Sequence, residues 1–386
     1  MADKPKKKVA VKKSGKRVAN KTPASPANSK KLQEVRIQID SIDNQIQELI
    51  TRRASWASKV REAKGELKAA VEYYRPERES QILRRVLDRN EGPLSDEVLL
   101  RVFREIMSAC LAQQEPLKVG FLGPEGTFSQ QALHKHFGHS AHTLPLASIE
   151  EVFQEIESGH ADFGVVPVEN SGQGTIQSTL DMFLTSKLKI CGEVELRVHQ
   201  HLLSRTGRLE DIERVYSHPQ SLAQCKAWLR ENLPNAEKIP LSSNAEAARR
   251  ARLADDCAAI AGETAGHVYG LKVVAGPIED RQDNTTRFLV IGREFFSPSG
   301  HDRTSLLVFV RDQPGALYNV LSPFAKHGVS MNRIESRPAH SGRWQYVFFI
   351  DVSGHIEDDN VSKAMSELGE FASDVKVLGS YPVALL

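Results

Sequence analysis

The run Asp283-Asn284-Thr285-Thr286-Arg287-Phe288-Leu289-Val290-Ile291 joins hydroxyl and amide side chains and one arginine to four apolar residues. The apolar half is typical of a buried strand. A buried strand holds the polar residues that precede it in a fixed place, so the run predicts a pocket whose polar groups stand at a strand end.

The region that precedes this run alternates short apolar strands with helical segments. Capping boxes at Ser148 with Glu151 and at Ser243 with Glu246 mark two helix starts. Strands that alternate with helices predict a parallel sheet. The expected strands are 118–122, 163–168, 214–217, 257–261 and 272–274.

Polar turns follow several of these strands. The turns at 123–129 and 169–175 are rich in glycine, and 217–220 reads Ser-His-Pro-Gln. Neither glycine turn is GxGxxG, so a dinucleotide is not expected. Glycine in each turn alone could serve only the turn's geometry. Together with the run at 283–291, the turns predict a site for a carboxylate, because helix starts offer free N–H groups to anions.

An apolar stripe at 3–4 spacing begins at Leu32 and predicts one helix of roughly 34 residues, about 50 Å long. A single seam of that length is expected to pair with a second chain. Arg53 lies in the seam, where it either extends to solvent or meets an anion. Lys64 lies about 20° from Arg53 around the helix axis, whereas Arg36 lies roughly 25 Å away along it. One small ligand bound by all three cations therefore requires Arg36 from a second subunit.

Two more helices are expected before residue 116. Pro76 suits the first turn of one, which carries Arg78 and Glu79, and Ser95 is expected to cap the other, which ends at Gln114. Gln114 continues an apolar stripe. The segment offers charged and amide groups without a nucleophile or a metal cluster, which favours a site that works by electrostatic preorganisation.

After residue 300 the pattern becomes strand 303–310, helix 315–327, strands near 329–336 and 344–352, helix 358–369 and strand 374–380. This βαββαβ order is typical of a ferredoxin-like α+β domain.

Charge and cysteine usage exclude several classes of protein. Residues 1–30 carry ten basic residues and one acid, which leaves 41 basic and 48 acidic residues elsewhere. We expect a disordered tail, solvated or in weak contact with a polyanion, on a body that does not bind nucleic acid. Four scattered cysteines predict neither zinc nor a disulfide framework, and a reducing cytoplasm is expected. We expect no signal peptide, because the tail lacks an apolar core, and no membrane span, because no run approaches about 18 apolar residues.

Residues 31–115 resemble the AroQ-type chorismate mutases through Arg36, Arg53, Lys64, the Arg78-Glu79 pair and Gln114. The resemblance implies an intertwined helical dimer in which Arg36 of the partner chain, Arg53 and Arg78 hold the carboxylates of chorismate. Lys64 and Gln114 would stabilise the ether oxygen, and Glu79 would bind a ring hydroxyl. Arg75 and Cys110 stand where the family often has an acid and a serine, so the substrate contact expected of Arg75 departs from the family pattern.

Residues 116–294 resemble the prephenate dehydratases through Gly-Pro-Glu-Gly-Thr-Phe-Ser at 123–129, Val-Pro-Val-Glu-Asn-Ser at 166–171, Ser-His-Pro-Gln at 217–220 and Thr-Arg-Phe at 286–288. The resemblance implies two α/β lobes, like type II periplasmic binding proteins, with prephenate between them and Thr286 as the essential residue. Arg287 would be a carboxylate clamp or, almost equally, a structural ion pair. The residues expected to position substrate are Asn170, Ser171, Thr175, Ser217 and Gln224.

Residues 302–386 resemble an ACT regulatory domain through Gly315-Ala316-Leu317-Tyr318 and Glu335-Ser336-Arg337-Pro338. These motifs imply binding of L-phenylalanine, and Tyr318 replaces the usual valine. The alternative is a domain that serves only dimerisation.

The resemblances together imply a chorismate mutase and prephenate dehydratase, inhibited by L-phenylalanine and at least dimeric, without metal or organic cofactor. The rival enzyme, a mutase joined to prephenate dehydrogenase, would need a dinucleotide fingerprint. The rival without catalysis, an amino-acid sensor, leaves Arg53 and Lys64 unexplained.

Overall fold

The computed structural model describes residues 26–64, 74–113, 115–311, 313–338 and 345–385, and the chain divides into two units at Ser55 and Trp56. Gln114 lies outside the described residues, as do the side chains of Lys64 and Pro338. None of the described helices is long and apolar enough to cross a membrane.

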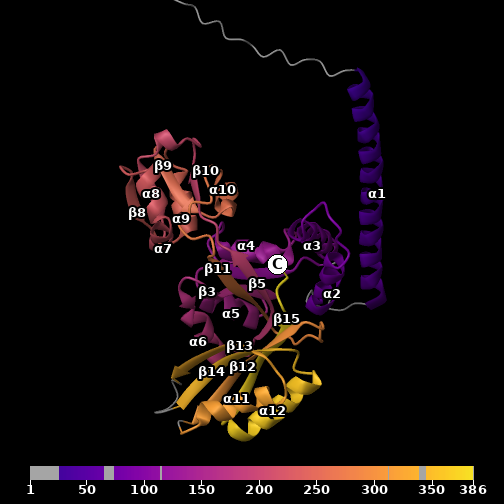
Figure 1. Cartoon of the computed structure of the whole chain (residues 1–386), viewed down its shortest axis with the longest axis vertical. Coiled ribbons are helices and arrows are strands. Elements are labelled where there is room, and N and C mark those ends of the chain that lie inside the picture. Colours follow the sequence, from indigo (N-terminus) through magenta and orange to yellow (C-terminus); the bar gives the residue numbers. More distant parts are fainter. Residues whose placement is uncertain (1–25, 65–73, 114, 312, 339–344, 386) are drawn as a thin grey trace, which may run out of the picture. The chain divides into compact units, whose positions relative to one another are not determined.

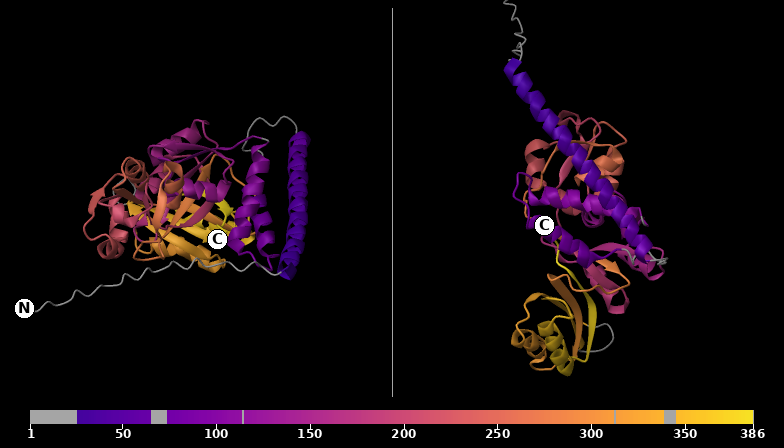
Figure 2. Two further views of the ribbon diagram at one scale, coloured as in Figure 1. Left: turned by 90° about the horizontal axis from the view of Figure 1, so that it is seen from above. Right: turned by 90° about the vertical axis from the view of Figure 1, so that its right-hand side faces the viewer.

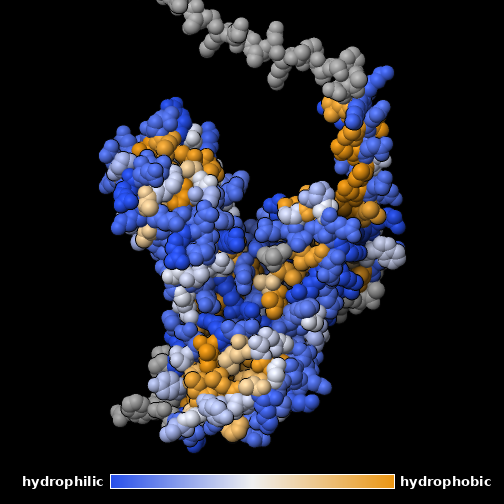
Figure 3. Space-filling model, viewed as in Figure 1, coloured by the Kyte–Doolittle hydropathy of each residue, from blue (hydrophilic) through white to orange (hydrophobic). Residues whose placement is uncertain are grey.

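Helix α1 (Pro26–Lys64) is continuous over 39 residues and crosses the division, with its residues up to Ser55 in the first unit (Figure 1 and Figure 2). It begins at Pro26 rather than at Leu32, so residues 26–30 of the predicted disordered tail are helical. Proline suits the first turn of a helix, because its fixed φ is helical and its missing N–H would have no partner there. The apolar seam is exposed along α1, from Leu32 (53% exposed) to Leu49 (59% exposed), and much of it is visible in Figure 3.

After the end of α1, the second unit contains a pair of helices, α2 (Pro76–Leu87) and α3 (Asp96–Ala112). Leu83, Leu100 and Met107 form their common core. Ser95 is the N-cap residue of α3, as predicted, although its hydroxyl makes no capping bond.

Two lobes follow, each built on a mixed sheet, so the predicted wholly parallel sheet was wrong. Apart from the short β4, one strand in each sheet runs against the rest: β11 in the first and β6 in the second. Each of these two strands directly follows a segment that connects the lobes, 198–200 before β6 and 276–284 before β11. These segments contain no crossover helix, which a parallel strand would need. In the first lobe the order is β2-β1-β3-β11-β5, with β4 beside β3. Its strands are β1 (Lys118–Leu122), β2 (His142–Leu146), β3 (Phe163–Asn170), β4 (Gly174–Thr175), β5 (Lys189–Arg197) and β11 (Thr285–Gly292).

The second lobe has the strand order β10-β6-β9-β7-β8. Its strands are β6 (His201–Ser204), β7 (Arg214–Ser217), β8 (Glu237–Pro240), β9 (Cys257–Ala261) and β10 (Lys272–Ala275). The helices of the two lobes are α4 (Phe128–Phe137), α5 (Ile149–Glu157), α6 (Gln177–Thr185), α7 (Pro219–Gln224), α8 (Lys226–Asn232), α9 (Asn244–Ala251) and α10 (Glu263–Tyr269), with a 3₁₀ turn at η2 (Leu209–Asp211). Ser148 and Ser243 cap α5 and α9, which confirms both predicted capping boxes as helix starts.

The last domain confirms the predicted βαββαβ order. Its antiparallel sheet, ordered β13-β14-β12-β15, is covered on one face by its two helices (Figure 1). The elements are β12 (Asp302–Arg311), α11 (Ala316–Lys326), β13 (Met331–Pro338), β14 (Gln345–Ser353), α12 (Asp359–Phe371) and β15 (Asp374–Pro382).

The other face of this sheet packs on the first lobe. Leu307, Phe349 and Leu378 share one apolar core with Phe183 and Leu289 of the lobe. The two backbones come very close at β15, because a Cβ on Gly379 would lie 2.1 Å from the carbonyl oxygen of Ile190. Any larger residue at 379 would push β15 away from β5.

Candidate active site

A cavity of about 540 Å³ is lined by residues of both lobes. Its walls include the turns at 123–129 and 169–175 and the starts of helices α4 and α9. Thr127 caps α4 by accepting from the N–H of Gln130 (3.4 Å), and Ser243 caps α9 by accepting from that of Glu246 (3.0 Å). Two helix N-termini that line one cavity favour an anionic ligand.

Thr286 and Asn170 form a hydrogen-bonded pair in the cavity wall. They are register partners on β11 and β3, and each is only 8% exposed. Asn170 Nδ2 donates to Thr286 Oγ1 (2.8 Å) and to Asn284 Oδ1 (2.9 Å). The N–H of Gly172 donates to Asn170 Oδ1 (3.0 Å), which fixes the orientation of the amide. The pair is therefore held by backbone as well as by side chains.

This arrangement leaves the Thr286 proton for a ligand. Because Asn170 Nδ2 can only donate, Thr286 Oγ1 is the acceptor in their bond, and its own O–H must point elsewhere. The amide also places a positive dipole against the oxygen, which would stabilise negative charge that develops there. Thr286 is thus arranged as a hydrogen-bond or proton donor.

The second lobe contributes amide and hydroxyl groups to the opposite wall. Gln200 Nε2 donates to Ser221 Oγ (3.2 Å) and Gln224 Oε1 (3.3 Å), and Asn244 Nδ2 donates to Ser221 Oγ (2.8 Å). Gln224 thus lines the cavity together with three residues that sequence reasoning missed. Ser221 and Asn244 lie in the first turns of α7 and α9, whose N-cap residues are His218 and Ser243, and no motif in the sequence distinguished them.

Ser217 stands behind this wall and does not line the cavity. It is fully buried, and its hydroxyl lies within hydrogen-bond distance of the Ile260 carbonyl (2.8 Å) and Asn244 Oδ1 (2.9 Å). The structure thus gives Ser217 the position of a support for Asn244 rather than of a substrate contact.

Three other residues expected to position substrate lie outside the cavity lining. Ser171 Oγ is exposed and accepts from the N–H of Thr285 (3.0 Å). Thr175 Oγ1 donates to Glu335 Oε2 and accepts from Arg333 Nη2 (both 2.9 Å), so it faces the C-terminal domain. Arg287 also faces that domain, because successive side chains of a strand point to opposite faces.

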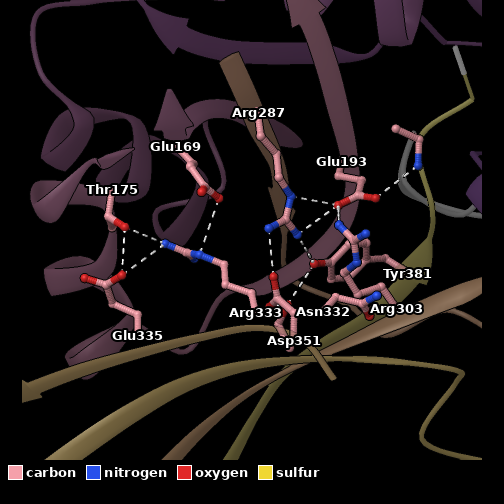
Figure 4. Close-up of polar contacts among 12 residues, drawn as sticks. Glu169, Thr175, Glu193, Arg287, Arg303, Asn332, Arg333, Glu335, Asp351 and Tyr381 are labelled. Atoms are coloured by element: carbon pink, nitrogen blue, oxygen red, sulfur yellow. Dashed lines mark hydrogen bonds and ion pairs between the residues drawn. The ribbon is translucent and has the colours of Figure 1, made fainter. Parts of the chain in front are cut away.

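Arg287 makes a structural ion pair rather than a carboxylate clamp for a ligand. Its guanidinium donates to Glu193 Oε2 (2.9 Å), Asp351 Oδ2 (2.7 Å) and Tyr381 Oη (3.0 Å), as Figure 4 shows. These partners favour the structural ion pair, the second of the two expected roles.

The candidate residues of the helical region lie on separate helices. Arg36, which is exposed, and Arg53, which is partly buried, are carried by α1. Arg75 precedes α2, Arg78 and Glu79 lie in its first turn, and both arginines are exposed.

The two motifs of the C-terminal domain lie on α11 and β13. Gly315 precedes α11 with φ +82°, a conformation that favours glycine, and Leu317 is 43% exposed. On β13, Ser336 is exposed, whereas Arg337 Nη1 donates to Asp181 Oδ1 (2.5 Å) on α6. Glu335 and Arg337 therefore face the first lobe.

Comparison with known proteins assigns each region to a family. Residues 35–115 match chorismate mutase type II, 119–295 match prephenate dehydratase and 304–370 match the ACT domain. A bifunctional chorismate mutase/prephenate dehydratase of Stutzerimonas stutzeri is 50% identical over 359 residues, which cover 92% of this chain and 98% of that protein.

Solved structures match the part that follows the helical region. Prephenate dehydratase from Arthrobacter aurescens in complex with L-Phe is 36% identical, with a TM-score of 0.64 over 69% of this chain and 90% of that one. GqqA, described as a novel type of quorum quenching acylase, is 30% identical, with a TM-score of 0.65 over 69% of this chain and 98% of that one. The three family matches and the full-length relatives agree, and the chain is an enzyme of the bifunctional chorismate mutase/prephenate dehydratase family.

Proposed function

We propose that the cavity between the lobes converts prephenate to phenylpyruvate, with Thr286 as the proton donor. The departing ring hydroxyl takes a proton from Thr286 and leaves as water. The electrons of the bond to the ring carboxylate enter the ring, CO2 is released, and solvent returns a proton to Thr286. The Thr286–Asn170 pair carries this proposal, because Asn170 both directs the hydroxyl and stabilises its oxygen.

Substrate binding in this cavity would use its anion-binding and amide groups. The starts of α4 and α9 offer free backbone N–H groups to the two carboxylates of prephenate. Gln224, with Gln200 and Asn244, would position the substrate from the second lobe.

The preceding reaction, chorismate to prephenate, is assigned to the helices of two copies of the chain. Arg36 of one copy and Arg53 and Arg78 of the other would hold the carboxylates, with Arg75 as a further contact. Lys64 and Gln114 would stabilise the ether oxygen, and Glu79 would bind the ring hydroxyl. The exposed seam of α1 supports a homodimer or a larger assembly, since an apolar stripe of this length is ordinarily covered.

L-Phenylalanine is proposed as the feedback inhibitor, bound through Gly315, Ala316 and Leu317 and through the motif that spans 335–338. The support is the ACT fold and the similar dehydratase that was solved with L-Phe. The two reactions and this inhibition would together serve phenylalanine biosynthesis.

Acyl transfer, which the likeness to GqqA raises, is not supported by the described cavity. It would need a nucleophile paired with a base. His218 is the histidine among the described lining residues, and its Nδ1 accepts from the N–H of Gln220 (3.3 Å) rather than from a hydroxyl.

The proposal is tested by Thr286→Ala, with Thr285→Ala as the matched control on the same strand. Thr286→Ala should lower phenylpyruvate formation at least about a hundredfold while chorismate consumption continues. Thr285→Ala should retain both rates. Full dehydratase turnover in Thr286→Ala would remove Thr286 from its role.

A further inference from the structure

Strands β3 and β11 present two consecutive pairs of side chains to opposite sides. Thr286 and Asn170 face the cavity. The next register pair, Arg287 and Glu169, reaches the ACT domain on the other side (Figure 4). The ACT domain therefore contacts β11 at Arg287 and β3 at Glu169, each next in sequence to Thr286 or Asn170.

Glu169 belongs to a small polar cluster centred on Arg333 of β13. Arg333 Nε lies 3.4 Å from Glu169 Oε2, and its Nη2 donates to Thr175 Oγ1 (2.9 Å). Thr175 also donates to Glu335 Oε2 (2.9 Å), a residue of the proposed effector motif. One hydroxyl thus joins the effector motif to the hairpin that carries Asn170.

Arg287 belongs to a second cluster, whose carboxylates are much more deeply buried, although the two arginines are similar (Arg333 is 14% exposed). The Arg287 side chain is 11% exposed, that of Asp351 is 9% exposed and that of Glu193 is fully buried. Glu193 also pairs with Arg303 and accepts from the N–H of Ala384 (3.1 Å). Separating such buried charges costs several kcal/mol, so this cluster acts as a fixed anchor.

The Arg333 cluster can rearrange at lower cost. One guanidinium serves two carboxylates, those of Glu169 and Glu335, and these side chains are 42% and 29% exposed. Both acids are partly solvated, and Arg333 keeps one of them as a partner during an exchange. Such an exchange therefore costs less than separating the buried charges of the Arg287 cluster. Of the two ion-pair clusters that join the ACT domain to the catalytic strands, the Arg333 cluster is thus the one that can change.

We infer that Arg333 is the residue through which effector binding at the ACT domain alters the Asn170–Thr286 pair. This inference rests on the proposed function and names the contact that regulates the proposed site. An effector that shifts β13 or draws Glu335 away changes how Arg333 holds Glu169 and Thr175. The hairpin at 169–175 then moves Asn170, while the Arg287 cluster keeps the domains together. Such an effector must bind the two arrangements with different affinity.

The test compares Arg333→Met, Glu169→Gln and the double variant in the full chain. The measured quantity is the ratio of the dehydratase rate without L-phenylalanine to the rate at saturating L-phenylalanine. Each single variant should lower this ratio about tenfold, and the double variant should lower it no further, because both changes break one contact. The rates without L-phenylalanine should stay within about threefold of wild type.

Lys376→Met is the matched control. Lys376 is also a cation of the ACT domain, and its Nζ donates to the carbonyls of Phe183 (2.8 Å) and Ser186 (2.5 Å), away from the catalytic hairpin. This variant should keep the wild-type ratio. Calorimetry should show that Arg333→Met still binds L-phenylalanine within about threefold of wild type, as expected for coupling rather than effector contact.

Several outcomes would overturn the inference. Unchanged inhibition in Arg333→Met, additive losses in the double variant, an equal loss in Lys376→Met or the loss of L-phenylalanine binding would each do so. Glu169→Gln supplies the answer if Arg333→Met fails to fold. A wild-type chain without inhibition, or full activity in Thr286→Ala, would instead contradict the proposed function.

Discussion

The dehydratase and mutase regions differ in how much of each proposed site a single chain provides. Both walls of the cavity that contains Thr286 come from the same chain, from two lobes that the chain visits in turn. In the helical region, Arg36 and Arg53 stand seventeen residues apart on the straight helix α1, roughly 25 Å along its axis. No small ligand can join both arginines within one copy.

The burial of apolar side chains also differs between the dehydratase and mutase regions. Strands β3 and β11 are covered on both faces, and Phe288, Val290 and Ile291 are almost fully buried in one chain. Along α1, by contrast, Ile39 and Ile46 remain about half exposed. Helix α1 thus carries both an exposed apolar seam and two arginines that are too far apart to bind one ligand. Both features are expected where two chains complete one site.

The largest expected effect comes from dividing the mutase arginines between two variants. Arg36→Ala and Arg53→Ala should each lower mutase activity about a thousandfold, since each removes a charge that binds a carboxylate. After mixing under conditions that exchange subunits, about a quarter of the sites regain both arginines, so about a quarter of the activity should return. Dehydratase activity should stay constant throughout. A lack of recovery with mixed dimers confirmed would place both arginines in the same copy.

A carboxylate placed in the apolar seam of α1 tests whether the mutase site, unlike the dehydratase site, depends on the pairing of two chains. Ile42→Asp would bury a carboxylate wherever two seams meet, and should lower mutase activity about a hundredfold. Asn44→Asp, two residues away and outside the seam, adds the same charge and should have no effect. Both rates are measured over a range of protein concentrations. The comparison fails if dehydratase activity falls in parallel or if mutase activity persists in Ile42→Asp.

Sequence patterns predicted the dehydratase cavity because its polar turns adjoin strands that hydrophobicity alone identifies. Thr286, Asn170 and Gln224, which the resemblance to the prephenate dehydratases implied as site residues, line this cavity. The patterns did not reveal where Thr175 and Arg287 point, because that depends on the domain packed behind β3 and β11. The sequence predicted strand β11 but not its antiparallel direction, for a related reason. Its direction is set by a return from the second lobe, which no local pattern records.

The smallest effect is expected at the junction between α2 and the first lobe, where the mutase and dehydratase regions meet. Tyr74 precedes α2 and is only 3% exposed. Its Oη lies 2.9 Å from His136 Nε2 on α4, and its ring packs edge-on against Phe163 (5.1 Å). Helix α2 is therefore anchored in the core of the dehydratase lobe, although it carries residues of the proposed mutase site.

This anchor should be sensitive to acid. Burial, reinforced by Arg104, lowers the pKa of His136 to about 3. In the unfolded chain, His136 is protonated below about pH 6.5, whereas in the folded chain it stays neutral until about pH 3. The free energy of unfolding therefore decreases as the pH falls from 6.5 towards 3. This one group should lower the free energy of unfolding by roughly 1.4 kcal/mol per pH unit in that window. His136→Gln should show a shallower dependence in denaturant unfolding at pH 4 to 7, whereas His142→Gln, at an exposed site, should keep the wild-type slope. Equal slopes in wild type and His136→Gln would mean that His136 is not held neutral, and that α2 is less firmly anchored in the lobe than its contacts indicate.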